Sequence, residues 1–265
     1  MNKNNYHTHT TRCFHAIGKD EEYVKAAIQA NIKELGFSDH TPWHYDSSFK
    51  ASMRMPECQL DDYIESIRYL KEKYKALETE GSYTVQSKMV LVSIIYAVLV
   101  SYMPWLEKML EDKKIDYIIL GNHYYQTDEL HQYFGSPVNE YYLKAYVDHC
   151  IKAIDTGLYS YIAHPDLVYY DKDSKLYQEE MSRLCDYAKE KDMPLEFNLL
   201  GFMSGRHYPN ESFWKIASKY KNKAIIGFDA HSPDALLKDD IYQQAFNYLS
   251  SLDVELIDTI KTLKK

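Results

Sequence analysis

The sequence predicts an α/β fold in which helices cover a parallel sheet, and three observations support this prediction. Short apolar runs alternate with longer amphipathic segments, which is typical of repeated strand–helix units. No linker-like or low-complexity stretch divides the 265 residues, so we expect a single domain over 1–265. Polar side chains gather where the predicted strands end. Because all strands of a barrel end at one mouth, whereas an open sheet gathers only those beside its switch point, this favours a (β/α) barrel.

Helices and strands alternate in the first half of the chain. Apolar residues at helical spacing predict helices over residues 20–35 and 60–74. Between them, GFSDH at 36–40 reads as a short strand that ends in polar residues. A third helix is expected at 105–112, and IDYIILGNH at 115–123 is predicted to be a buried strand that stops at a histidine.

The second half of the chain repeats this alternation. YSYIAHPD, PLEFNLL and KAIIGFDAH each join an apolar run to a polar end, which predicts three strands. Apolar residues at helical spacing predict the helices that flank them. These helices cover residues 141–155, 176–191, 211–220 and 234–249.

The stretch from Met89 to Leu106, MVLVSIIYAVLVSYMPWL, carries no charge and approaches the length of a membrane-spanning helix, ~17–25 residues. Its many β-branched residues, Pro104 and the polar segments around it instead favour a buried strand that runs into the start of a helix. We therefore expect no membrane span.

The composition limits the classes of partner and compartment. A net charge of −8 argues against a general nucleic-acid binder, so a bound anion must be held locally by metal or by a few arginines. The four cysteines show no CxxC spacing, which indicates reduced thiols in a cytoplasmic protein. The first residues lack the apolar region of a signal peptide. The sequence gives no indication of the oligomeric state.

The predicted strand ends supply residues for a metal centre. His7 and His9 are two positions apart, so on a strand both imidazoles face the same side and can bind one ion. Asp229 and His231 repeat this spacing on the last predicted strand. Imidazole together with carboxylate suits zinc, iron or manganese. Single histidines at further strand ends are His40, His123 and His164. Histidines without a paired ligand, expected to be structural or surface residues, are His44, His131, His149 and His207.

The motifs HTHTTRCFH, GFSDH, LGNHYY, AHPD and GFDAHS, taken in this order, resemble the PHP (polymerase and histidinol phosphatase) family. The resemblance is to its histidinol-phosphate phosphatases and runs from Tyr6 to about Leu249. It implies a distorted seven-stranded (β/α) barrel that holds two or three divalent ions at its mouth. It also implies hydrolysis of L-histidinol phosphate to L-histidinol and phosphate in histidine biosynthesis.

The resemblance further implies which residues hold the ions. One ion takes His7, His9 and Asp229, a second takes His123 and His164, and a third takes His15, His40 and His231. Cys13 is not part of this set. Asp229 and His231 are the candidate catalytic residues: Asp229 could accept a proton from the attacking water, and an imidazole would help the alkoxide to leave.

One position departs from the family. The family has a bridging glutamate at the end of its third strand, but no acidic residue lies between Glu80 and Glu107, although 39 of the 265 residues are acidic. Three interpretations remain open. Glu78 or Glu80 reaches the site by another path, the position near Ile94 to Val98 is truly apolar, or the recorded stretch contains a reading-frame artefact.

Two arginines are candidates for binding the phosphate of a small-molecule ester. Arg54 lies in SMRMPE, and Arg206 follows the predicted strand PLEFNLL. The guanidinium fork suits phosphate because it donates two parallel hydrogen bonds. Arg12 is a third candidate.

Other functions stay open at this stage. The protein could be a PHP phosphoesterase for another small phosphate ester or a nucleotide. The missing carboxylate also leaves room for a metal-binding homologue with impaired catalysis. A membrane protein is the remaining alternative, and it depends only on residues 89–106.

Overall fold

The computed structural model describes residues 2–75, 88–92 and 96–261. Within them, the framework is one sheet of seven strands, in which each strand pairs in parallel with the next along the chain. The predicted α/β class with a parallel sheet is therefore confirmed. The strands are β1 (Gly36–His40), β2 (Lys88–Val92), β3 (Ile119–Leu120), β4 (Tyr161–Ile162), β5 (Leu195–Asn198), β6 (Lys223–Gly227) and β7 (Glu255–Leu256).

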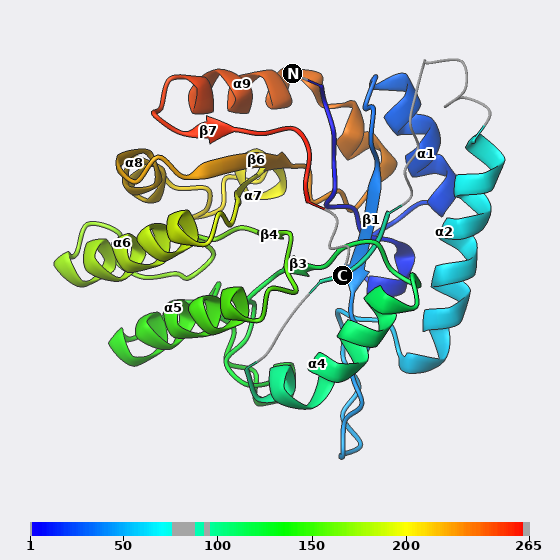
Figure 1. Cartoon of the computed structure of the whole chain (residues 1–265), viewed down its shortest axis with the longest axis horizontal. Coiled ribbons are helices and arrows are strands. Elements are labelled where there is room, and N and C mark those ends of the chain that lie inside the picture. Colours follow the sequence, from blue (N-terminus) through cyan, green and yellow to red (C-terminus); the bar gives the residue numbers. More distant parts are fainter. Residues whose placement is uncertain (1, 76–87, 93–95, 262–265) are drawn as a thin grey trace.

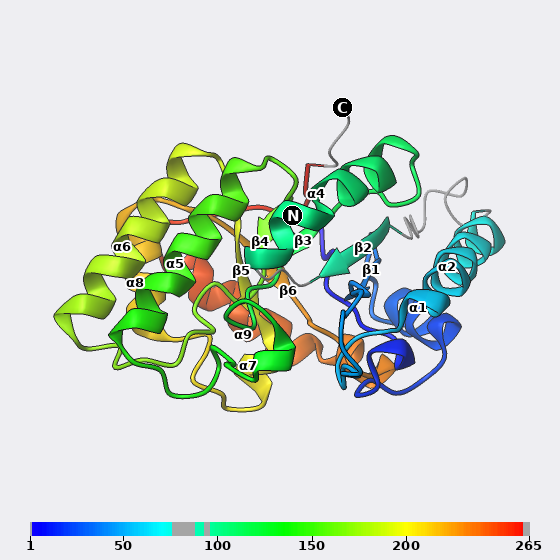
Figure 2. The same cartoon turned by 90° about the horizontal axis from the view of Figure 1, so that it is seen from below.

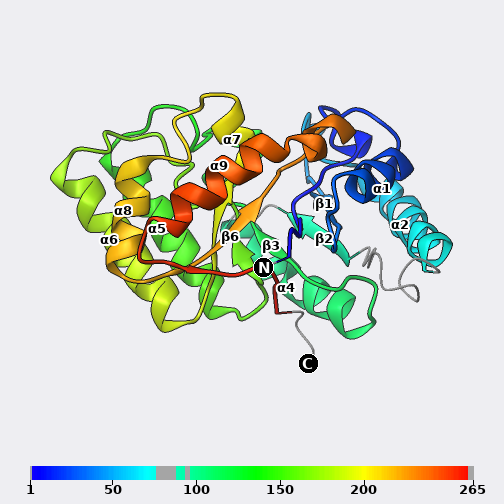
Figure 3. The ribbon, with the colours of Figure 1, turned by 90° about the horizontal axis from the view of Figure 1, so that it is seen from above.

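Helices lie at opposite sides of the molecule around the sheet. Figures 1 and 2 show α5, α6 and α8 together at one side of the molecule, with α1 and α2 at the opposite side. Figure 3 shows α9 running between these two groups. The α-helices are α1 (Asp20–Gln29), α2 (Leu60–Tyr74), α4 (Tyr96–Glu111), α5 (Glu140–Asp155), α6 (Lys175–Glu190), α7 (Leu199–Met203), α8 (Glu211–Lys219) and α9 (Asp239–Ser250). The 3-10 helices are η1 (Thr11–Cys13), η2 (Glu57–Gln59), η3 (Asp128–Leu130) and η4 (Pro233–Leu237).

Side-chain caps explain where three of the helices begin. Before α5, α6 and α8, a side-chain oxygen accepts a hydrogen bond from the backbone N–H three residues later, which satisfies a donor that the helix leaves unpaired. The capping residues are Asn139, Ser174 and Asn210. The apolar faces of these helices then pack into a core rich in aromatic rings. Its fully buried tyrosines include Tyr23, Tyr63, Tyr146 and Tyr177. A second, smaller cluster contains Tyr6, Tyr117 and Tyr161.

The N-terminal segment is hydrogen-bonded on both sides. Toward β1, the Asn5 carbonyl accepts from Gly36 N at 2.7 Å. Toward the residues after β6, His9 N donates to Ala230 O at 2.9 Å, and Ala230 N donates to His7 O at 3.0 Å. This pairing places His7 and His9 beside the segment that carries Asp229 and His231.

The structure corrects several predicted elements. The long strands expected at 115–123 and 159–166 shrink to two residues each, because polar loops at the sheet edge take over their ends. His7 and His9 lie in a segment with isolated bridges at Asn5 and Thr8 rather than in a regular strand. The first helix ends at Gln29, before Asn31 adopts a left-handed φ of 57°. Neither α7 nor β7 was predicted.

The apolar run at 89–106 forms β2 and, from Tyr96, the beginning of α4, so the expected strand followed by a helix is confirmed. Among the residues that the structure describes, no helix combines the length and apolar character needed to span a bilayer. The bridging glutamate of the family is expected near Ile94 to Val98, and residues 93–95 lie outside the described residues. Glu78 and Glu80, the other candidates for this role, also lie outside them.

His149 in α5 allows a test of burial. It is 8% exposed, and burial lowers the pKa of its imidazole from 6.5 to about 4. At a pH between these two pKa values, the His149 imidazole is protonated in the unfolded chain and neutral in the folded chain. The free energy of unfolding therefore falls as the pH is lowered. Between pH 7 and pH 5, the free energy of unfolding of the metal-free wild type, measured with urea, should decrease by about 2 kcal/mol more than that of metal-free His149→Gln. Equal losses in the two proteins would contradict this prediction.

Candidate metal centre

Three of the predicted ligands meet at one point. The Nε2 atoms of His7 and His9 are 3.2 Å apart, and Oδ1 of Asp229 lies 3.3 Å from the first and 3.1 Å from the second. Ligand atoms on a tetrahedral zinc ion, each about 2.1 Å from the metal, are separated by roughly 3.4 Å. The triangle therefore has the size that one ion requires.

Hydrogen bonds that Nδ1 donates direct the other ring nitrogen of three histidines toward this region. In His15 and His231, Nδ1 lies 2.6 Å and 2.8 Å from the carbonyl oxygen two residues earlier. A carbonyl only accepts, so Nδ1 carries the proton. In His7, Nδ1 lies 2.8 Å from Oε1 of Glu196, another acceptor. Each of these rings therefore keeps the lone pair of Nε2 for a metal.

Other buried polar atoms of the cluster have no hydrogen-bond partner. These are Nδ1 of His9, His40, His123 and His164, together with Oδ1 of Asp229. Buried nitrogen and oxygen atoms are rarely left without a partner, and an unseen ion is one of the accepted explanations. The donor set, imidazoles with one carboxylate, fits zinc, iron or manganese. The residues present therefore fit a metal centre.

All eight predicted ligands line one cavity of about 630 Å³. The imidazole centroids of His123 and His164 are 4.6 Å apart, as are those of His15 and His231. The His9 ring lies 4.6 Å from that of His40. Side chains from the N-terminal segment and from the ends of β1, β3, β4 and β6 thus come together as the sequence predicts.

The protonation states of four imidazoles and of the carboxylate suit metal binding. Burial lowers the pKa of His164 to about 4 and that of His231 to about 3, and it holds the pKa of His40 and His123 well below the ordinary value. For Asp229, burial raises the pKa, but the neighbouring imidazoles outweigh it and hold the pKa well below the ordinary range. At neutral pH these groups are neutral imidazoles and a charged carboxylate, which are the forms that bind metal. At His9, burial lowers the pKa, but hydrogen bonds with Asp229 and Asp39 outweigh it and raise the pKa well above the ordinary value, so an ion would have to displace that proton.

The two candidate phosphate-binding arginines differ in position. Arg206 is exposed and lines the cavity, and its Nη1 donates to Tyr208 Oη at 2.7 Å. Arg54 is 1% exposed and is absent from the lining. Its Nε donates to Asp128 Oδ2 at 2.9 Å and its Nη1 to the Thr41 carbonyl at 3.0 Å. We therefore do not retain Arg54 for phosphate binding, because its guanidinium is buried in an ion pair.

Arg54 instead anchors the loop between β1 and α2, whose Ser52 and Met53 line the cavity. Asp128 also accepts from Tyr45 Oη at 2.6 Å, so one buried carboxylate holds the loop at two points. Removing one partner of a buried ion pair strands the other, so Arg54→Met should lower the free energy of unfolding by about 3–5 kcal/mol. The inhibition constant of inorganic phosphate should stay near that of the wild type. Weaker phosphate binding without a loss of stability would contradict this role.

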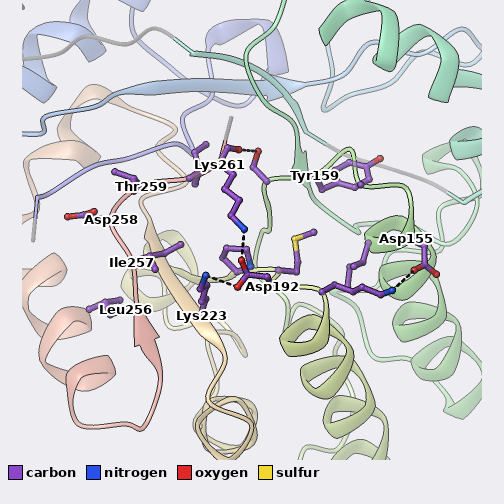
Figure 4. Close-up of a pocket in the computed structure, with 16 residues that line it drawn as sticks. Asp155, Tyr159, Asp192, Lys223, Leu256, Ile257, Asp258, Thr259 and Lys261 are labelled. Carbon is purple, nitrogen blue, oxygen red and sulfur yellow. Dashed lines mark hydrogen bonds and ion pairs between the residues drawn. The ribbon is translucent and has the colours of Figure 1, made fainter. Parts of the chain in front are cut away.

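A larger cavity, of about 860 Å³, lies where β5 and β6 begin and beneath the C-terminal segment (Figure 4). None of the predicted ligands lines it. Its lysines are paired with carboxylates: Lys223 and Lys261 contact Asp192, and Lys191 contacts Asp155. The larger cavity is therefore not the candidate site. The smaller cavity is, because all eight predicted ligands line it.

Two residues near the centre were not assigned from the sequence. Glu196 in β5 is fully buried behind His7, and the alternation of the strand LEFN, which turns Glu196 and Asn198 to one face, could have revealed it. Cys13, which the resemblance leaves out, has its Sγ within 4.8 Å of ligand atoms of His9 and His231. Burial raises the pKa of its thiol, but hydrogen bonds with histidines outweigh this and lower it to about 7.

Comparisons with known proteins show the family to which this chain belongs. The PHP domain family model matches residues 5–199. A curated relative, the probable histidinol-phosphatase of Deinococcus radiodurans, is 25% identical over 249 residues, which cover 86% of this chain and 85% of the relative.

Two solved structures share the fold. The putative histidinol phosphatase of Listeria monocytogenes superposes with a TM-score of 0.68 at 18% identity and covers 89% of this chain and 98% of its own. The histidinol phosphate phosphatase of Lactococcus lactis, solved with zinc, L-histidinol and phosphate, gives 0.67 at 16% identity and covers 98% and 99%.

Proposed function

Because the chain belongs to the PHP domain family, we propose that it is a metal-dependent phosphomonoesterase that hydrolyses L-histidinol phosphate to L-histidinol and phosphate. The observation that carries this proposal is the triangle of His7, His9 and Asp229 at the wall of a cavity that Arg206 also lines. A metal centre together with a cation that grips the phosphoryl group is a combination that promotes phosphate-ester hydrolysis.

We propose a centre of two or three divalent ions. The short distances within the first two groups of ligands support the assignment. The third group follows the family resemblance, because the ring of His231 lies closer to His9, at 4.2 Å, than to His15, at 4.6 Å. The three ligand sets are His7, His9 and Asp229, then His123 and His164, then His15, His40 and His231. When bound, such ions lower the pKa of a coordinated water and withdraw charge from phosphoryl oxygens.

The protein's own residues have separate tasks in this reaction. Asp229 accepts a proton from the attacking water and passes it to the departing histidinol oxygen, so that the alcohol leaves in its neutral form. His231 would support this departure through the ion that its Nε2 would hold, because its Nδ1–H donates to the Asp229 carbonyl. Arg206 orients the phosphoryl group with its guanidinium fork. The aromatic side chains that line the cavity, Tyr124, Tyr133 and Tyr208, restrict access of bulk water.

We also propose that the sheet is the distorted seven-stranded barrel of the family and that residues 1–265 form one domain. The N-terminal segment, hydrogen-bonded both to β1 and to the residues after β6, supports closure of the sheet. Closure brings the first and last ligand pairs together, which an open sheet of this strand order would keep apart.

A substrate panel tests the function. We expect metal-loaded protein to release phosphate from L-histidinol phosphate faster than from other monoesters, a nucleotide or a diester, and to lose this activity in a chelator. Faster turnover of another phosphate ester would show that the proposed substrate is wrong but that the proposed reaction class, phosphate-ester hydrolysis, is right.

A second candidate is a metal-binding homologue with impaired catalysis, which the lack of acidic residues between Glu80 and Glu107 favours. Bound-metal stoichiometry measured beside turnover separates the two. Two or three ions per chain with no hydrolysis of any tested ester would favour the second candidate.

A further inference from the structure

Glu196 is a buried carboxylate outside the proposed ligand set. Its side chain is 0% exposed, and Oε1 lies 2.8 Å from Nδ1 of His7. Oε2 accepts hydrogen bonds from the backbone N–H of His164 at 3.0 Å and from Asn198 Nδ2 at 3.0 Å. One carboxylate thus contacts residues assigned to two different ions, His7 and His164.

Asn198 extends this network to a third ligand. Its Nδ2 also lies 3.1 Å from Oδ2 of Asp229, while its Oδ1 accepts from Gly201 N at 2.9 Å and caps α7. The amide is therefore held in one orientation, with its two donors aimed at Glu196 and Asp229. A change at Glu196 would reach His7, His164 and, through Asn198, Asp229.

The neighbouring strand leaves room for this carboxylate. Gly227 of β6 pairs with Asn198 of β5, and a Cβ built on Gly227 would lie 1.8 Å from Oε1 of Glu196. Any larger residue at 227 would displace the Glu196 carboxylate from His7. Glycine at position 227 is therefore a second observation, independent of the hydrogen bonds, that supports the position of the Glu196 carboxylate beside His7.

We propose that Glu196 is a positioning residue that holds His7 and His164, ligands of two different ions, in fixed positions relative to each other. It keeps the proton of His7 on Nδ1, so that Nε2 faces the cavity, and it fixes the backbone from which His164 projects. This inference rests on the proposed metal-dependent function, but it concerns metal loading and not the identity of the ester. Loss of such an acceptor behind a ligating histidine typically costs about 10- to 100-fold in metal affinity.

The test measures metal binding by the full-length protein, without substrate. Zinc and manganese affinities are obtained by competition with a chromophoric chelator for the wild type, Glu196→Gln, Glu196→Asp and Gly227→Ala. We expect each variant to bind about 10- to 100-fold more weakly. Combining Glu196→Gln with Gly227→Ala should add little, because both changes remove the same contact. Nitrogen NMR of the zinc-loaded protein should show His7 protonated at Nδ1 in the wild type and a mixture of tautomers in Glu196→Gln.

The aspartate variant separates positioning from charge, since it keeps the carboxylate but withdraws it from His7. Wild-type affinity in Glu196→Asp would overturn the proposal, as would wild-type affinity in both Glu196→Gln and Gly227→Ala. Glu255→Gln on β7 is the matched control and should bind metal normally. If the protein binds metal in this Glu196-dependent way but does not hydrolyse histidinol phosphate, the inference stands and the proposed substrate fails.

Discussion

Replacing Asp229 with asparagine should abolish phosphatase turnover, lowering kcat by roughly 10³-fold or more, and should reduce the metal content. Asp229 is the one carboxylate among the eight proposed ligands, and its Oδ1 lies within 3.3 Å of two imidazole nitrogens. A neutral amide removes the charge that balances the ions and cannot accept a proton from the attacking water. Phosphate release from histidinol phosphate and elemental analysis measure both effects.

Asparagine is the informative substitution because Asp229 has a left-handed backbone with a φ of 49°. Asparagine tolerates this conformation, whereas alanine adds strain that could itself disturb the site. His7→Ala should also abolish activity and lower the metal content. Asp192→Asn, the same change at the larger cavity, should leave turnover unchanged. Normal hydrolysis by Asp229→Asn or His7→Ala would refute the site assignment.

The parallel α/β framework could be predicted from the sequence because its elements are specified locally. The strand GFSDH and the helix over 60–74 were predicted with the bounds that the structure gives. The short strands β3, β4 and β7 could not be delimited, since two residues carry too little periodicity. The pairing of the N-terminal segment with residues beyond β6 depends on contacts between the chain ends, which no local pattern encodes.

At the site, four histidines could be predicted because each follows an apolar run at a strand end: His40, His123, His164 and His231. His7 and His9 were found by their spacing, and His15 only through the family resemblance. Arg54 shows the limit of this reasoning, because a sequence does not reveal whether an arginine faces solvent or a buried aspartate such as Asp128. Glu196 was not predicted for a related reason. A carboxylate within an apolar strand has no evident role in the sequence until its partner, His7, is known. Contacts that support a ligand, such as that of Glu196 with His7, join residues far apart in the chain and cannot be read from the sequence. Ligands can be recognised from residue type and spacing.

Replacing Arg206 with glutamine should raise KM for histidinol phosphate and lower kcat/KM by about 100-fold, since a hydrogen bond to a charged group contributes about 1.5–3 kcal/mol. Arg206 follows α7 and is fixed by its backbone N–H, which donates to Gly201 O at 3.0 Å, and by the bond from Nη1 to Tyr208 Oη. Arg206→Lys should recover only part of the loss, because an ammonium lacks the planar fork. Steady-state kinetics provide the measurement.

Inhibition by inorganic phosphate distinguishes binding from chemistry in this variant. If Arg206 grips the phosphoryl group, the inhibition constant of phosphate must rise in parallel with KM, because product and substrate share that group. Tyr208→Phe removes only the hydrogen bond that orients the guanidinium, so its effect should be several-fold smaller than that of Arg206→Gln. An Arg206→Gln protein with normal phosphate inhibition would show that the anion is held by the metal centre alone. We do not expect that outcome, because Arg206 is the one arginine or lysine among the described residues that line the cavity.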